Sequence, residues 1–339
     1  MLEPFISGLA LLSSTTKSPG IIVGPVANFL GVIYNAVFNF IYGFVQANSL
    51  GIAIILFTLL VKTVLIPLSY KQQKSTFAMQ KLQPEMNKIK EKYAGKKDAE
   101  SQQKMALEMQ KLQKDNNISM FGGCLPLLVQ LPILYALFYI FQQAYLYIDV
   151  VGMNYQAITD LLLSMPVDLR LDVFTDIINE HKLYIDVASS ADMIRLVNDM
   201  TIADWNAVTA SIGDYAAQLT PLLAQKTQME TFFGISLVHN AGLGFPGILV
   251  PLLSAATTYF SSKIITKQSG VQQNGAQDPM MQSMKMMNIM MPIMMGVMCI
   301  TLPAGIGIYW TVSNLIQVCQ TLLLNKYFRS KDAKEAVKQ

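Results

Sequence analysis

Long apolar runs alternate along the chain with charged segments. The first of these runs, LGIAIILFTLLVKTVLIPLSY (50–70), contains one charged side chain, Lys62. Four other runs contain no Lys, Arg, Asp or Glu and approach or reach the roughly 20 residues that a helix needs to cross a bilayer. They are residues 119–148, 245–262, 286–302 and 303–325. With 52% hydrophobic and 14% charged residues, the sequence predicts an all-α polytopic membrane protein with five transmembrane helices.

Residues 21–47 are apolar but carry a polar stripe. Asn28, Asn35, Asn39 and Gln46 recur at helical spacing and share one face of the predicted helix. Such a helix can lie flat in the membrane interface. We interpret it as an interfacial amphipathic helix, and a sixth span is the alternative. The two interpretations place the N-terminus on opposite sides of the membrane.

The distribution of charge predicts the orientation of the spans. Residues 71–118 contain eleven Lys, and residues 263–285 contain three. The segment after Asn325 contains four Lys and one Arg. Residues 149–244 instead contain twelve Asp or Glu against four Lys or Arg. The positive-inside rule places the basic segments, including the C-terminus, in the cytoplasm and the acidic segment outside.

These patterns predict the following organisation. The segment 71–118 is a helical hairpin that turns near Gly95, because two apolar stripes flank that glycine. The predicted order is an extracytoplasmic N-terminus with its interfacial helix (1–48), transmembrane helix 1 (49–70), the cytoplasmic hairpin (71–118), transmembrane helix 2 (119–148), a small helical extracytoplasmic insertion (149–244), transmembrane helix 3 (245–262), a cytoplasmic loop (263–285), transmembrane helices 4 (286–302) and 5 (303–325), and a basic cytoplasmic tail (326–339).

The sequence contains none of the common motifs of nucleotide hydrolysis, nucleophilic hydrolysis or zinc catalysis. No phosphate-binding loop, nucleophile elbow, paired-cysteine zinc pattern or zincin helix occurs, and His181 and His239 stand alone. We therefore predict that the protein is not an enzyme and needs no metal or cofactor.

Lys62 is the most informative polar residue within the spans. A cation at the centre of a membrane helix costs about 3 kcal/mol by insertion scales, so it is usually kept for a polar cavity inside the protein. The alternative is that its long side chain reaches the cytoplasmic interface. The first interpretation predicts a functional site inside the membrane.

Other polar residues in the spans extend this prediction. Thr257, Thr258 and Ser261 fall about one helical turn apart, and Asn314 and Gln317 share a face. With Lys62, Thr63 and Gln130 they would form a hydrated groove, whereas ordinary hydrogen bonding between helices is the alternative.

Methionines are concentrated between residues 280 and 298. Flexible thioether side chains can accept varied apolar partners, so we expect Met287, Met291 and Met294 to contact hydrophobic ligands. Packing within the membrane core is the alternative of equal weight.

Five segments carry a family pattern. They are TLLVKTVLIPLSYKQQKS (58–75), LQPEMNKIKEKY (82–93), FGGCLPLLVQLPILYALFY (121–139), PLLSAATTYFSSK (251–263) and MMPIMMGVMCITLPAGIGIYWTVSNLIQVCQTLLLNKY (290–327). In this order they resemble the YidC/Oxa/Alb membrane protein insertases. The resemblance implies a five-span bundle around a hydrophilic groove, which receives hydrophobic segments and releases them sideways into lipid without nucleotide hydrolysis.

The resemblance also assigns roles to residues. The family usually carries an arginine in the first span, where this chain has Lys62, which keeps the charge but lacks the planar guanidinium fork. Trp310 matches a groove tryptophan of the last span, and Ser261 or Ser262 stands where glutamine is often found. The insertion 149–244 departs from the short loop of many relatives.

The implied partners are newly made membrane proteins, membrane lipids, the ribosome through the hairpin and the basic tail, and a secretion translocon. The implied location is the bacterial plasma membrane, with several spans and a cytoplasmic C-terminus. A secondary transporter or channel with Lys62 as a substrate or ion site is the alternative function. Such folds often contain internal repeats, and this sequence shows none.

Overall fold

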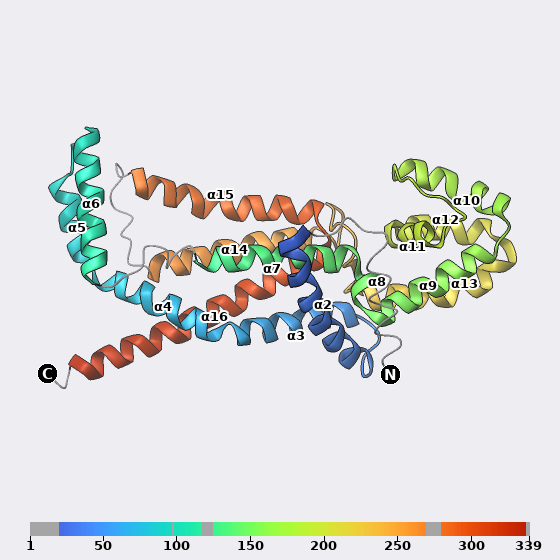
Figure 1. Ribbon diagram of the computed structural model, residues 1–339, viewed down its shortest axis with the longest axis horizontal. Helices are drawn as coiled ribbons and strands as arrows, with labels where there is room; N and C mark the ends of the chain where they lie inside the picture. The colour runs from blue at the N-terminus through green and yellow to red at the C-terminus, as the bar shows by residue number, and fades with distance from the viewer. Residues whose placement is uncertain (1–19, 97, 117–124, 269–278, 337–339) are drawn as a thin grey trace. The chain divides into compact units, whose positions relative to one another are not determined.

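The computed structural model describes residues 20–96, 98–116, 125–268 and 279–336, and these are nearly all α-helical (Figure 1). They divide into two compact units. Unit 1 contains the described residues up to Phe57 and those within 132–251 and 298–309. Unit 2 contains those within 58–131, 252–297 and 310–339. The fold class predicted from the sequence is thus confirmed as predominantly α.

The helices and strands have the following bounds. Unit 1 contains α2 (Gly20–Tyr42), α8 (Ala144–Tyr147), α9 (Asp149–Ser164), α10 (Val167–Glu180), α11 (Ser190–Asp199), α12 (Ile202–Ser211), the 3-10 helix η2 (Gly213–Tyr215), α13 (Ala216–Glu230), β1 (Thr231–Phe232) and β2 (Ile235–Ser236). Unit 2 contains α4 (Ile66–Lys81), α5 (Gln83–Lys92) and α6 (Ala99–Asp115). The boundary between the units falls within α3 (Ser49–Val64), α7 (Leu125–Gln142), α14 (Leu249–Gln268), α15 (Pro279–Thr301) and α16 (Ala304–Ala336).

By length and composition, few of the described helices could cross a membrane. Val23–Tyr42 is long and apolar enough by itself, and α3 is so only together with α4, across a bend of 61°. Gln130–Gln142 and Asn288–Thr301 are shorter apolar helices. The length and apolarity of Val23–Tyr42 are the properties that a sixth span would need.

The bend between α3 and α4 lies within the first predicted span. Pro67 occupies the first turn of α4, where its missing N–H is tolerated but where it prevents a continuous helix. The chain therefore leaves α3 at Val64 and begins α4 at Ile66.

Helix α2 buries one face within unit 1. Tyr34 is fully buried, donates a hydrogen bond to the Leu50 carbonyl at 3.1 Å and packs edge-on against Phe57. On the polar stripe, the Asn35 amide donates to an Asp149 carboxylate oxygen at 2.7 Å, and its oxygen accepts from the Asp149 backbone N–H at 3.1 Å. The stripe of α2 thus binds the first turn of α9.

The predicted insertion is helical and has its own core. Helix α9 lies beside α11 and α13 (Figure 1), and its buried residues recur at helical spacing, including Val151, Tyr155, Ile158 and Leu162. Helix α12 begins with a capping box, in which Thr201 and Asp204 exchange hydrogen bonds. These features explain why a segment without cysteine holds its structure.

Backbone hydrogen bonds hold the first residues of α16 in place within unit 1. The Ala304 N–H donates to the His239 carbonyl at 2.8 Å, and the Gly305 N–H donates to the Leu237 carbonyl at 3.0 Å. A Cβ at Gly305 would lie 3.1 Å from that same carbonyl oxygen. Glycine permits this close approach.

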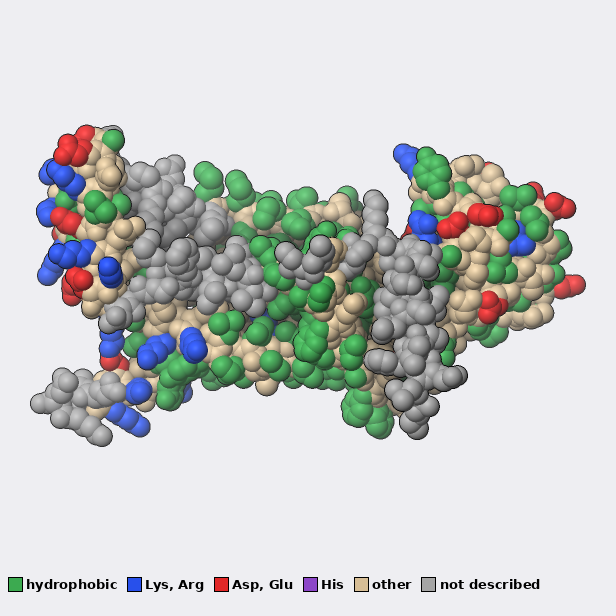
Figure 2. Space-filling view, in the orientation of Figure 1, with side chains coloured by type: hydrophobic (Ala, Val, Ile, Leu, Met, Phe, Trp, Pro, Cys, Tyr) green, Lys and Arg blue, Asp and Glu red, His purple; other side chains and the backbone are tan. Residues whose placement is uncertain are grey.

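Helices α5 and α6 pack as an antiparallel pair. Leu82 and Met86 are buried against Met109 and Leu112. Glu108 of α6 accepts from Lys92 at 2.6 Å and from the Tyr93 hydroxyl at 2.9 Å. Basic and acidic side chains cover the outside of this pair in Figure 2.

Candidate functional site in the predicted membrane segments

Lys62 is buried on α3 with only 9% of its surface exposed. Its ammonium forms no hydrogen bond or ion pair with any side chain that the structure describes. Its backbone carbonyl accepts from the Gln320 amide of α16 at 3.3 Å. Burying a charged ammonium costs several kcal/mol unless water or polar groups solvate it.

Thr258 is the centre of a second set of polar contacts, between α14 and α16. The Trp310 indole N–H donates to its hydroxyl at 2.9 Å, and the hydroxyl donates to the Ser254 carbonyl at 2.6 Å. The Asn314 amide lies 2.9 Å from the same hydroxyl. With the amide turned over, its oxygen also accepts from the Trp310 indole at 3.2 Å, so both orientations join the same three side chains.

This polar face of α14 is longer than Thr258 alone. The hydroxyl of Ser254 lies 3.2 Å from that of Thr311, and Ser261 is buried one turn further along. Ser254, Thr258 and Ser261 are spaced at i, i+4 and i+7, which places them on one side of the helix. Thr257 instead bonds mainly to its own helix, through the Leu253 carbonyl at 2.7 Å.

The remaining predicted site residues are less closely joined. Thr63 is exposed and donates to the Leu59 carbonyl of its own helix at 2.7 Å. Consecutive helical residues point about 100° apart, so Thr63 does not accompany Lys62 to its buried position. Gln130 and Gln317 are partly buried. Met291 is partly buried and Met294 is 51% exposed, whereas the Met287 side chain lies outside the described set.

Two residues that the predicted site did not include contact its members. The Gln320 amide donates to the Lys62 carbonyl, and the Ser254 carbonyl accepts from the Thr258 hydroxyl. The signal for both was their spacing, because each lies one turn from a predicted site residue on the same helix. The Gln320 side-chain oxygen and the Thr321 hydroxyl are buried with no partner among the described residues, as is expected where water or a ligand completes a polar site.

Replacing Thr258 with valine should lower the stability of the protein by about 1–2 kcal/mol. Valine keeps the shape but removes the acceptor for Trp310 and leaves its buried N–H dependent on Asn314 alone. Thermal unfolding in detergent measures the change. The matched control is Thr63→Val, which removes an exposed hydroxyl and should change stability by less than about 0.5 kcal/mol.

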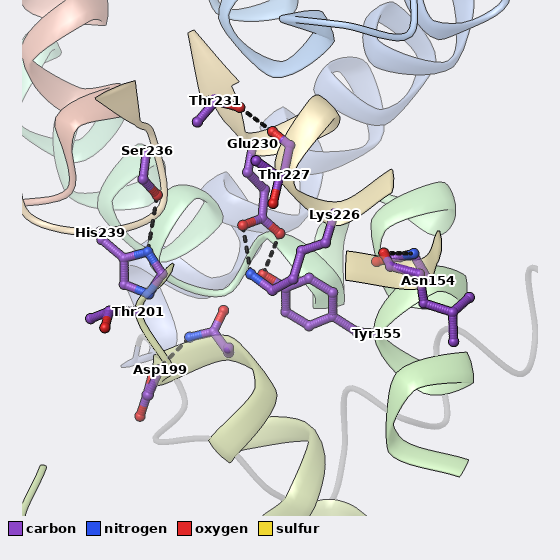
Figure 3. A network of polar contacts seen from close by, with 12 residues as sticks. Asn154, Tyr155, Asp199, Thr201, Lys226, Thr227, Glu230, Thr231, Ser236 and His239 are labelled. Atoms are coloured by element: carbon purple, nitrogen blue, oxygen red, sulfur yellow. Dashed lines mark hydrogen bonds and ion pairs between the residues drawn. The ribbon is translucent and has the colours of Figure 1, made fainter. Parts of the chain in front are cut away.

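A separate polar network lies outside the predicted spans, between α9 and α13 (Figure 3). Lys226 and Glu230 are each 4% exposed and form an ion pair at 2.6 Å. The Tyr155 hydroxyl donates to the second Glu230 oxygen at 2.7 Å, and the Lys226 ammonium lies 4.7 Å from the centre of the Tyr155 ring. Burial, and then the Glu230 charge, raises the pKa of Tyr155 well above its ordinary value. The network joins two helices of the insertion.

The family model described as "60Kd inner membrane protein" matches residues 40–332, which include Lys62, the α14–α16 contacts and the Lys226 network. The chain belongs to this family. It is the YidC/Oxa/Alb family that the sequence resembles, so that prediction is confirmed.

Curated relatives in the family cover most of the chain. The membrane protein insertase YidC of Clostridium perfringens is 30% identical over 93% of this chain and 95% of its own length. The protein of that name from Enterococcus faecalis is 30% identical over 88% of this chain and 78% of its own length. The one from Oceanobacillus iheyensis is 26% identical over 95% of this chain and 96% of its own length.

In this family member, no group of three or more His, Cys, Asp or Glu among the described residues is arranged to hold a metal ion. His239 instead lies near the polar network of Lys226, Glu230 and Tyr155 (Figure 3). One ring nitrogen lies 2.9 Å from the Ser236 hydroxyl. Burial, and then the Lys226 charge, lowers the pKa of His239 below its ordinary value of 6.5.

His239 should make the insertion less stable in acid. Between its lowered pKa and 6.5, the unfolded chain binds a proton that the folded chain does not, so stability falls as the pH falls through this window. His239→Asn should reduce this dependence. The measurement is thermal unfolding of both proteins at several pH values, and parallel pH profiles would contradict the assignment.

Proposed function

We propose that this chain is a membrane protein insertase that receives hydrophobic segments of newly made proteins beside Lys62 and releases them laterally into the bilayer. One observation carries the proposal. Lys62 is a buried ammonium without a described partner, in a chain whose relatives are named membrane protein insertase. A cation held in this way supports a role in binding a transient polar or anionic group.

The energetics need no nucleotide. A substrate helix of about 20 apolar residues gains far more free energy on entering lipid than one short acidic flank costs in crossing it. The flank therefore sets the barrier. Lys62 would lower this barrier by pairing with the flank partway across, and nearby hydroxyl and amide groups would replace part of its lost hydration.

The proposed groove uses the polar side chains described above together with a methionine surface. Its polar members are Lys62, Thr63, Gln130, Thr257, Thr258, Ser261, Trp310, Asn314 and Gln317. The exposed side chain of Met294, with Met287 and Met291 on the same helix, would contact the apolar part of the substrate. Exposed apolar residues on α15, including Ile293 and Val297, would allow release into lipid.

We place the protein in the bacterial plasma membrane, as the family description "inner membrane protein" supports. Five spans with a cytoplasmic C-terminus follow from the charge distribution. Helices α5 and α6 and the basic tail are the candidate contacts for the ribosome, and a secretion translocon is a candidate partner.

Reconstitution tests this function directly. The purified protein is placed in liposomes without nucleotide, and a small single-span protein with an acidic translocated end is added. Protease protection of that end measures insertion. We expect insertion well above that of empty liposomes. No gain over empty liposomes, with the helical circular dichroism of the insertase intact, would reject autonomous insertion.

A further inference from the structure

A basic cavity lies between α14 and α16 in unit 2, apart from the Lys62 site. Its volume is about 770 Å³. It is lined by Ile264, Lys267, Leu322, Asn325, Lys326, Arg329 and Ser330. The α16 members recur at i, i+3, i+4, i+7 and i+8, so they form one continuous face of that helix.

The cavity continues the helix pair that the polar contacts hold together. Ser254 contacts Thr311, and Thr258 contacts Asn314, at nearly constant sequence offset. Lys267 and Lys326 follow at almost the same offset further along both helices, and here a cavity replaces the direct contact. The cavity therefore lies further along the same pair of helices.

The charges of the cavity are uncompensated. Lys267, Lys326 and Arg329 are exposed and form no ion pair with any residue in the described parts of the chain. Among the described residues, no Asp or Glu lines the cavity. Asp332, the acidic residue nearest in sequence, forms its ion pair with Lys81. Three cations facing one space favour an anion with several oxygen atoms, such as a phosphate group.

The apolar side chains that line the cavity indicate which class of phosphate compound it binds. Ile264 and Leu322 line the cavity, and the neighbouring Ile265 and Leu323 are exposed on the same helices. None of the described residues that line it is aromatic, although single-stranded RNA is commonly bound by stacking its bases on aromatic rings. Cations next to exposed aliphatic residues match a lipid, whose headgroup is charged and whose acyl chains are apolar.

We propose that this cavity binds the phosphate headgroup of an anionic phospholipid, with the acyl chains lying along Ile264 and Leu322. Lys267, Lys326 and Arg329 bind the phosphate oxygens. The Asn325 amide and the Ser330 hydroxyl are available to hydrogen-bond the glycerol part of the headgroup. The inference goes beyond the insertase function and does not depend on it.

Binding to the full-length protein in a neutral detergent tests the proposal. The probes are short-chain phosphatidylglycerol, short-chain phosphatidylcholine and inorganic phosphate, and calorimetry measures their affinities. The test variant is Lys267→Gln/Lys326→Gln. The matched control is Lys263→Gln/Lys334→Gln, which removes two exposed cations from the same two helices outside the cavity.

We expect the native protein to bind phosphatidylglycerol more tightly than the other two probes. The test variant should lose roughly thirtyfold in affinity and the control less than about twofold, because each of the two removed cations contributes on the order of 1 kcal/mol and about 1.4 kcal/mol corresponds to tenfold. Equal losses of affinity in the test and control variants would show that general surface charge attracts the lipid, and would overturn the proposed site. Inorganic phosphate binding as tightly as the lipid, or a short RNA displacing the lipid from the native protein but not from the test variant, would overturn the assignment to lipid.

Discussion

Lys62→Ala should slow the insertion of substrates with an acidic translocated flank by about ten- to a hundredfold. A charge-assisted hydrogen bond is worth about 1.5–3 kcal/mol, and its loss at the barrier appears directly in the rate. Because Lys62 is buried without a described ionic partner, its removal breaks no ion pair with the described residues. The effect should therefore fall on insertion and not on folding. Lys62→Arg should retain most of the rate.

Substrate charge provides the internal control. A substrate with a neutral flank has no carboxylate to pair, so its insertion rate should change little in Lys62→Ala. Val64→Ala is the matched neighbouring variant, because Val64 is 70% exposed on the same helix and is not a member of the proposed groove. Rates in Lys62→Ala that match native rates for both substrates would remove Lys62 from the mechanism.

Lys226→Met should destabilise the helical insertion by about 3–5 kcal/mol. The substitution removes the cation that neutralises the buried Glu230, and Tyr155 alone remains to bond that carboxylate. Thermal unfolding followed by circular dichroism measures the loss of stability. Hydrogen exchange shows whether this loss falls in α9 and α13.

The double variant Lys226→Met/Glu230→Leu should recover much of this loss, because no uncompensated charge stays buried. Lys182→Met is the control, since Lys182 lies exposed on the same insertion. A loss in Lys226→Met no larger than that of the control would show that the Lys226–Glu230 ion pair does not stabilise the contact that Tyr155 of α9 makes with α13.

The sequence predicted the helical class and the family because both depend on local patterns. Apolar runs indicate helices, and the motif around Trp310 is contiguous. Helical spacing also indicated Thr258 and Asn314 as candidates for contacts between helices, since each shares a helical face with other polar residues.

Contacts between distant segments could not be predicted in this way. The bond from Gln320 to the Lys62 carbonyl depends on how two helices align, and helical spacing within one segment does not encode that alignment. Lys226 and Glu230 have the spacing of an ordinary surface pair. Their burial depends on the packing of α13 against other helices of the insertion, α9 among them.

Site-specific crosslinking tests the central claim most directly. A photoreactive residue at Gln317, on the polar face of α16, is compared with one at Leu323, which is 68% exposed on the same helix. During insertion in proteoliposomes, we predict an early substrate crosslink from position 317 that disappears as the substrate becomes protease-protected. This crosslink should weaken in Lys62→Ala. No crosslink from position 317 during productive insertion, or the same signal from position 323 throughout, would contradict a route through the Lys62 site.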